Sequence, residues 1–135
     1  MGRVRFHDSC TAKWQLMHDL APHLVPQESS PELFVHESGA NNNLFLSEQR
    51  YPPNFTFGIH CHGSDEINYI LGGEVICGGR VLRAGASMYV AAHTLYQFKA
   101  GPAGVHFLQF KASGDLSFFT MDQFKELRKA RVAKG

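Results

Sequence analysis

The sequence predicts an all-β fold followed by one C-terminal helix. Between residues 31 and 112, short runs rich in Phe, Val, Ile, Leu and Tyr alternate with Gly, Asn and Pro at intervals typical of all-β proteins. No long helical pattern separates these runs, which favours antiparallel strands closed into a sandwich or barrel. At 135 residues, the whole chain 1–135 is expected to form a single domain.

The expected strands are short, and glycine pairs separate some of them. Gly72-Gly73 and Gly78-Gly79 are predicted as tight turns, because glycine adopts the left-handed backbone conformation that such turns need. The predicted strands are Leu33–His36, Leu44–Tyr51, Thr56–Cys61, Glu66–Leu71, Glu74–Cys77, Arg80–Leu82, Ser87–Ala91, Leu95–Lys99 and Val105–Lys111.

The two ends of the chain differ from the middle. Residues 1–30 are predicted as an N-terminal arm, in which the stretch from Trp14 to Leu20 could form a short helix. Thr120 followed by Gln123 makes a capping box, so a C-terminal helix is predicted over residues 120–132, covering one side of the barrel.

Charge and composition exclude several classes of partner. The formal net charge is +1 and the basic residues are spread along most of the chain, so nucleic acid is not an expected partner. No apolar run is long enough to cross a bilayer, and the N-terminus lacks a secretory pattern, so neither a membrane nor export is predicted. The three cysteines are an odd number without close pairing, which fits a reducing, cytoplasmic location.

The strongest chemical signal is a cluster of two histidines and one glutamate. Side chains alternate between the faces of a strand, so His60 and His62 point the same way and Cys61 points the opposite way. Glu66 opens the next strand and can return a carboxylate to the same side. Two imidazoles and a carboxylate are the ligands of a facial triad for Fe(II), and they also suit Zn, Mn or Ni. The alternative is that these residues are only polar lining at the mouth of a barrel.

The stretch from His60 to Glu66, followed after six residues by Gly73, resembles the first sequence motif of the cupins, His-x-His-x3-Glu-x6-Gly. The turn at Arg83-Ala84-Gly85 is also similar to a cupin, whereas Asn54 stands where the family has a glycine. The resemblance implies a cupin-type double-stranded β-helix, which is a jelly-roll barrel, with a divalent transition metal (Fe, Mn, Ni or Zn) bound in it.

The second cupin motif is poorly matched, because only Gly85 is retained. Tyr96 occupies the position at which the resemblance implies a further metal-binding histidine, and it is expected to line the pocket as a weak ligand or as an acid/base group. Two alternatives stay open: His93 could swing in from the preceding turn, or His106 could face the pocket from the next strand. Asn68 shares the face of Glu66 and could orient a substrate.

These residues predict a small metal-dependent enzyme. His60, His62, Glu66 and Tyr96 would hold the metal, with Glu66 and Tyr96 as catalytic residues. The expected substrate is a compact oxygenated or aromatic metabolite, processed by dioxygenation or by isomerase, lyase or decarboxylase chemistry. The alternatives are a ligand-binding or sensor barrel with weak or no metal binding, and a barrel that serves only dimerisation. A homodimer paired through its sheets is expected.

Overall fold

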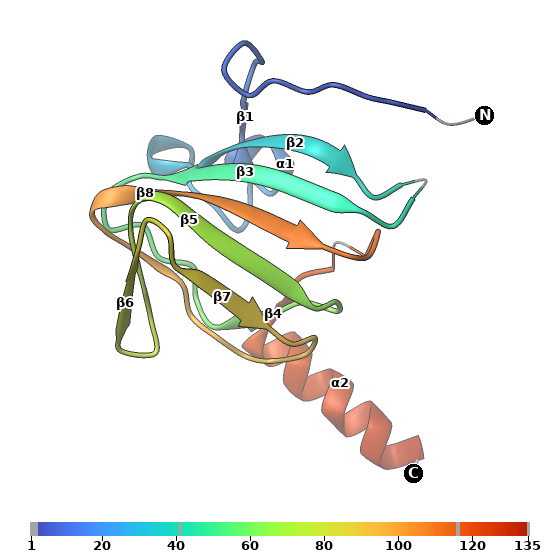
Figure 1. The fold of residues 1–135 in the computed structure, drawn as a ribbon. Helices are drawn as coiled ribbons and strands as arrows, with labels where there is room; N and C mark the ends of the chain where they lie inside the picture. The colour runs from blue at the N-terminus through green and yellow to red at the C-terminus, as the bar shows by residue number, and fades with distance from the viewer. Residues whose placement is uncertain (1–2, 41, 116, 135) are drawn as a thin grey trace.

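The structure, a computed structural model, describes residues 3–40, 42–115 and 117–134 and is built around one large antiparallel sheet (Figure 1). The two longest strands, β5 and β8, lie side by side in it. The neighbouring strands are, in order, β1 (Gln15–Leu16), β2 (Glu32–Ser38), β3 (Phe45–Tyr51), β8 (Lys99–Lys111), β5 (Glu66–Cys77) and β6 (Arg80–Arg83), and β7 (Ser87–Val90) also pairs with β5. The prediction of a mostly antiparallel β fold is confirmed.

The opposite wall is less regular than the sequence suggests. It contains a two-stranded sheet of β4 (His60–Cys61) and β9 (Phe119–Thr120). The predicted strand Thr56–Cys61 forms only at its end, and most of the predicted strand Leu95–Lys99 is irregular; isolated bridges at Thr56–Lys99 and His60–Tyr96 connect the two segments. Pro52 and Pro53, just upstream of Thr56, have no N–H group to donate to a regular ladder of hydrogen bonds.

The two predicted glycine turns have different outcomes. Gly78-Gly79 is a tight turn between the paired residues Cys77 and Arg80, as expected. Gly72-Gly73 is not a turn; it lies within the continuous strand β5, where the register against β8 shifts. Gly73 has a φ of +66°, and a Cβ there would lie 2.2 Å from the backbone oxygen of Gly104. A close approach of two strands, rather than a reversal, therefore requires this glycine.

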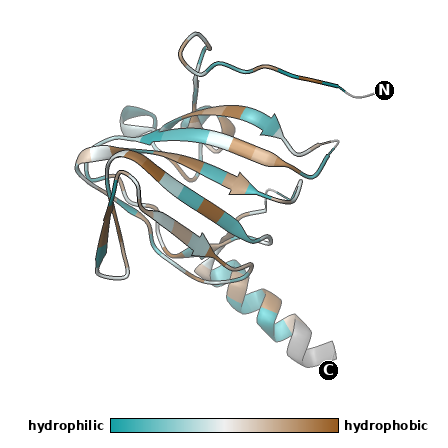
Figure 2. Ribbon diagram, viewed as in Figure 1, coloured by the Kyte–Doolittle hydropathy of each residue, from teal (hydrophilic) through white to brown (hydrophobic). Residues whose placement is uncertain are grey.

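The core lies on the inner face of the sheet. Hydrophobic and polar residues are interleaved along β5 and β8, as Figure 2 shows. Ile70 and Phe107 are fully buried there, and each such side chain contributes about 1.5–3 kcal/mol by its burial. The buried apolar cluster consists of Tyr51, Ile70, Val75, Phe98, Ala100, Val105 and Phe107.

The N-terminal arm lies across the outer face of the sheet. The centroid of the Trp14 ring lies 6.4 Å from that of Phe34. The Arg50 guanidinium carbon lies 4.0 Å from the centroid of the Trp14 ring. The expected short helix is reduced to one turn, α1 (Met17–Leu20), because the two residues before it pair with β2 as β1. A short 3-10 helix follows at Gln27–Ser29.

The C-terminal helix α2 (Met121–Lys134) begins as predicted but does not cover the barrel. The Thr120 N–H donates to Gln123 Oε1 at 2.9 Å, and the Gln123 N–H donates to Thr120 Oγ1 at 3.3 Å, which confirms the capping box. Figure 1 shows the helix projecting away from the sheet, and its main contacts are with β4 and β9. Leu127 is exposed. The apolar stripe is too short to hold the later turns against the barrel. No helix within the described residues is long and apolar enough to span a membrane.

Candidate functional site

The two predicted histidines lie together on β4 and its continuation. The His60 N–H donates to the Tyr96 carbonyl at 3.0 Å, and the Tyr96 N–H donates back at 2.9 Å, which holds β4 beside the opposite loop. The imidazole centroids of His60 and His62 are 5.1 Å apart, and both rings line one cavity. Cys61, between them, is fully buried and does not line this cavity.

The hydrogen bonds of the two imidazoles fix which nitrogen is free. His60 Nδ1 lies 2.8 Å from the Gly58 carbonyl, and His62 Nδ1 lies 2.9 Å from the Ser117 carbonyl. Because a carbonyl oxygen only accepts, each Nδ1 carries the proton and each Nε2 presents a lone pair. Burial lowers the pKa of His60, and burial together with the charge of Lys111 lowers the pKa of His62 to about 4. Both rings are therefore neutral near pH 7.

Glu66 lies behind these histidines with both carboxylate oxygens occupied. The carboxylate is buried; Oε1 accepts the Tyr96 hydroxyl proton at 2.6 Å and Oε2 accepts from Gln109 Nε2 at 2.7 Å. Oε1 is also 4.0 Å from His62 Nε2. Burial, and then the neighbouring Glu66 charge, raises the pKa of Tyr96, so its phenol stays protonated. Tyr96 thus acts here as a hydrogen-bond donor rather than as a phenolate.

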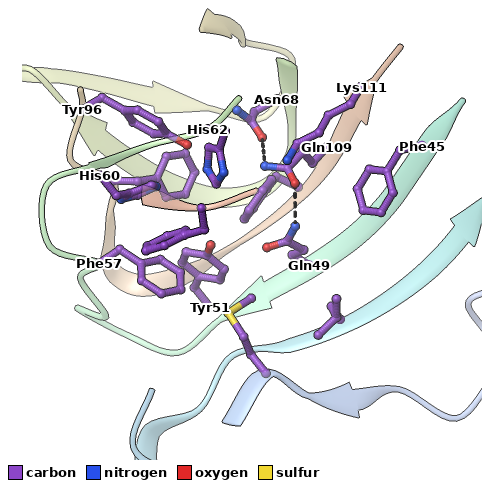
Figure 3. Close-up of a pocket in the computed structure, with 15 residues that line it drawn as sticks. Phe45, Gln49, Tyr51, Phe57, His60, His62, Asn68, Tyr96, Gln109 and Lys111 are labelled. Carbon is purple, nitrogen blue, oxygen red and sulfur yellow. Dashed lines mark hydrogen bonds between the residues drawn. The ribbon is translucent and has the colours of Figure 1, made fainter. Parts of the chain in front are cut away.

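Sequence reasoning missed an amide network beside Glu66. The Gln109 side chain donates to Asn68 Oδ1 at 3.3 Å, and Gln49 Nε2 donates to Gln109 Oε1 at 3.3 Å, as the dashed lines in Figure 3 show. Gln49 also donates to Ser47 Oγ at 3.0 Å. These amides fix the orientation of Gln109 and, through it, of the Glu66 carboxylate.

Lys111 is the second residue that sequence reasoning missed. It is only 3% exposed at the end of β8, and its side chain reaches towards Gln109 and Asn68 (Figure 3). Its ammonium lies 5.7 Å from the Phe45 ring centroid. Burial lowers the pKa of Lys111, although the charges of Glu66 and Asp115 oppose that shift.

These side chains surround a cavity of about 190 Å³. This is smaller than the 300–1,000 Å³ typical of pockets for drug-sized ligands, so a compact molecule fits. The Phe118 ring stacks 4.6 Å from His60 and closes one side. The lining residues are mainly apolar and aromatic: Met17, Leu33, Phe45, Gln49, Tyr51, Phe57, His60, His62, Asn68, Tyr96, Phe98, Phe107, Gln109, Lys111 and Phe118.

The structure corrects the two alternative pocket histidines. His93 is exposed in a turn with a φ of +61°, and its ring lies beside Phe119, away from the cavity. His106 neighbours the inward-facing Phe107 on β8 and therefore points to the outer face, where Glu48 binds it. Neither side chain lines the cavity. Of the additional pocket residues, Asn68 alone lies at the cavity.

Comparison with known proteins identifies the fold. The sequence matches no protein-family model and no curated protein. Among solved structures, an RmlC-like cupin from Shewanella frigidimarina superimposes with a TM-score of 0.61, at 16% identity, over 82% of this chain and 93% of its own. The chain has the cupin fold. KdgF from Halomonas sp. matches with a TM-score of 0.61, at 19% identity, over 82% of this chain and 94% of its own.

A third similar structure is longer than this chain. The DMSP lyase DddQ from Ruegeria pomeroyi matches with a TM-score of 0.64, at 19% identity, over 84% of this chain. The match covers 63% of DddQ, which is less than two thirds of that protein's length.

The residues around the cavity fit a metal ion in their chemistry, with one adjustment. The Nε2 atoms of His60 and His62 are free and face the cavity, which is the arrangement of metal-bound histidines. The Glu66 carboxylate adjoins them, but Tyr96 and Gln109 hold its oxygens. As arranged, no three His, Cys, Asp or Glu side chains in the described part of the chain are grouped around one point. Glu66 could join the histidines by exchanging one of its hydrogen bonds.

Proposed function

We propose that this cupin is a metal-dependent enzyme for a compact metabolite. A divalent transition metal, Fe, Mn, Ni or Zn, is held by His60 Nε2, His62 Nε2 and the Glu66 carboxylate. The observation that carries the proposal is the pair of neutral imidazoles with Nδ1 bound to backbone carbonyls and Nε2 facing the cavity. Such ligands leave coordination positions open for a substrate.

Within this proposal the metal, when bound, polarises a substrate oxygen or, as Fe(II), binds dioxygen. Tyr96 holds a proton at its hydroxyl, 2.6 Å from Glu66 Oε1, and is placed to donate a hydrogen bond or a proton. The aromatic walls exclude water and select an oxygenated or aromatic substrate. Dioxygenation, isomerisation, elimination and decarboxylation all fit this arrangement, and the similarity to DMSP lyase DddQ supports a lyase among them.

A second candidate is a cupin that binds a ligand without catalysis. It is favoured by one observation: Tyr96 and Gln109 already satisfy both Glu66 oxygens, so this carboxylate needs no metal as a partner. Such a barrel would bind a small molecule as a sensor and would contain only traces of metal.

Elemental analysis of protein purified without an affinity tag separates these candidates. We expect about one metal ion per chain in the unaltered protein, and a trace in the double variant His60→Ala with Glu66→Gln. His93→Ala removes an exposed histidine outside the cavity and should keep the metal. Full retention of metal by the double variant would disprove the proposed metal site. Only a trace of metal in the unaltered protein would favour the second candidate, which binds a ligand without catalysis.

The reaction is tested after the metal is known. If the metal is iron, oxygen consumption in the presence of small diketones and catechols reports dioxygenation. If it is zinc, nickel or manganese, the same panel is followed for isomerised, cleaved or decarboxylated products. Turnover should disappear in the double variant and persist in His93→Ala.

We also propose a homodimer formed through the outer face of the sheet. Ile67 on β5 pairs with Tyr89 on β7 and with Phe110 on β8, and all three side chains are exposed. Tyr69 and Leu71 continue this apolar surface along β5. Light scattering should give a dimer for the unaltered chain and a monomer for Ile67→Lys, whereas a monomeric unaltered chain would overturn the proposal.

A further inference from the structure

Two hydrogen-bond donors in the cavity have no partner among the described residues. Lys111 is 3% exposed and lines the cavity, yet no carboxylate of the described residues forms an ion pair with it. Asn68 is 1% exposed, and its Nδ2 is the one buried side-chain nitrogen or oxygen in the described part of the chain without a hydrogen bond. Both side chains belong to the same cavity wall.

The two donors are close neighbours in the sheet. Asn68 on β5 pairs directly with Gln109 on β8, and Lys111 is the next inward-facing residue of β8. They are therefore diagonal neighbours on adjacent strands, a spacing that lets two side chains reach one small group. Figure 3 shows both beside Gln109 at the same end of the cavity.

Leaving these donors unpaired is unfavourable for a folded protein. A buried amide N–H without an acceptor loses its hydration, and a buried ammonium without a counter-ion loses far more. Glu66 does not supply the missing acceptor, since Tyr96 and Gln109 bind its two oxygens. A bound anion would satisfy both donors at once.

The surroundings restrict the anion to a single negative charge. Among the described residues, Lys111 is the one lysine or arginine that lines this cavity. A phosphate dianion would keep an uncompensated charge, whereas a carboxylate matches one ammonium and offers its second oxygen to an amide N–H. The remaining wall is apolar and aromatic and suits a hydrocarbon body.

We propose that Lys111 Nζ and Asn68 Nδ2 bind the carboxylate of a compact monocarboxylic acid, whose apolar or aromatic body lies against the phenylalanines of the cavity. As an assignment of the substrate class this rests on the proposed function, but the carboxylate contact itself requires no metal. The substrate is then anchored at the Lys111 end of the cavity, and its reacting part lies towards His60 and His62.

Binding of matched acids and amides tests this assignment. Propionate, 2-oxobutyrate and benzoate are titrated by calorimetry into the full chain, both as purified and after EDTA treatment, alongside the neutral amides propionamide and benzamide. At least one acid should bind in both samples, and roughly tenfold or more tightly than its amide, because the hydrogen bonds to a carboxylate are charge-assisted. Equal binding of acid and amide, or no binding of any acid, contradicts the proposal.

Variants show whether the named donors are responsible. Lys111→Met and Asn68→Leu should each lose roughly tenfold or more in acid affinity while binding the amide as before. Lys99→Met removes an exposed lysine from the same strand and should bind the acids unchanged. Circular dichroism confirms that each variant is folded; if Lys111→Met does not fold, Asn68→Leu alone decides.

The failure of this proposal can be distinguished from failure of the metal site. Metal-free protein that binds acids through Lys111 supports the carboxylate contact even if elemental analysis disproves the metal. Acids that bind only the metal-loaded protein, with full affinity in Lys111→Met, would show that the metal holds the carboxylate and would overturn the inference.

Discussion

The inner and outer faces of the large sheet both carry buried polar residues, but these residues differ in how many of their hydrogen bonds are formed. On the outer face, Glu48 Oε1 accepts from His36 Nε2 at 3.1 Å and Glu48 Oε2 accepts from His106 Nε2 at 2.5 Å. On the inner face, Gln109 is fully bonded, whereas within the described part of the chain Asn68 Nδ2 has no hydrogen bond and Lys111 has no ion pair. The outer cluster is complete within the protein, whereas the inner one lacks an acceptor.

This difference distinguishes a structural cluster from the binding site that we propose. Burial acts to raise the pKa of Glu48, yet hydrogen bonds from Ser9, His36 and His106 together lower it. The outer carboxylate is thus stabilised as an anion by its neighbours. The inner cation forms no ion pair with a described residue. The charges of Glu66 and Asp115 oppose the desolvation of Lys111 only in part, because its pKa is still lowered, and this is a state expected of a group whose partner is a ligand.

The largest expected effect is on the outer face. Glu48→Ala removes the acceptor of both histidines and should lower the free energy of unfolding by about 2–3 kcal/mol in urea denaturation. Glu74→Ala is the matched control, because Glu74 pairs with the exposed Arg83 and should contribute less than about 1 kcal/mol. Equal losses in the two variants would contradict the structural role of Glu48.

A change of opposite sign is expected on the inner face. Lys111→Met replaces an unpaired buried cation by an apolar side chain of similar length and should raise the free energy of unfolding by about 1–2 kcal/mol without ligand. Lys99→Met, on the exposed face of the same strand, should change it by less than about 0.5 kcal/mol. A clear loss of stability in Lys111→Met would show that Lys111 has a partner within the protein.

A smaller effect is expected from the buried histidines in metal-free protein. The unfolded chain binds a proton at a histidine near pH 6.5, whereas His62 in the folded chain binds it only near pH 4. Stability should therefore fall as the pH is lowered through this interval, by about 1 kcal/mol between pH 6 and pH 5 for this group. Urea denaturation should show a weaker pH dependence for His62→Gln and an unchanged one for His93→Gln.

The sequence predicted the fold class and the shared orientation of His60 and His62, because alternation along a strand depends on backbone geometry alone. The same rule could have found Gln109 and Lys111: with Phe107 in the core, residues 109 and 111 face inward and His106 faces outward. Lys111 was not predicted to line the cavity, because lysine is almost never buried without a partner.

Other features depend on contacts between distant segments. Gly72-Gly73 was predicted to be a turn. Gly73 must be glycine because the backbone of Gly104 approaches it closely, and Gly104 lies on another strand that the local sequence does not reveal. The hydrogen bonds that occupy Glu66 come from Tyr96 and Gln109, which are 30 and 43 residues away in the chain. Local patterns hold no information about such pairs.

Anomalous X-ray diffraction at the absorption edge of the bound metal locates the proposed metal site directly. We expect one peak in the cavity, about 2.0–2.2 Å from His60 Nε2 and from His62 Nε2, with Glu66 as a further ligand. A peak among His36, Glu48 and His106 on the outer face would contradict it, as would a loaded protein without a peak at His60 and His62.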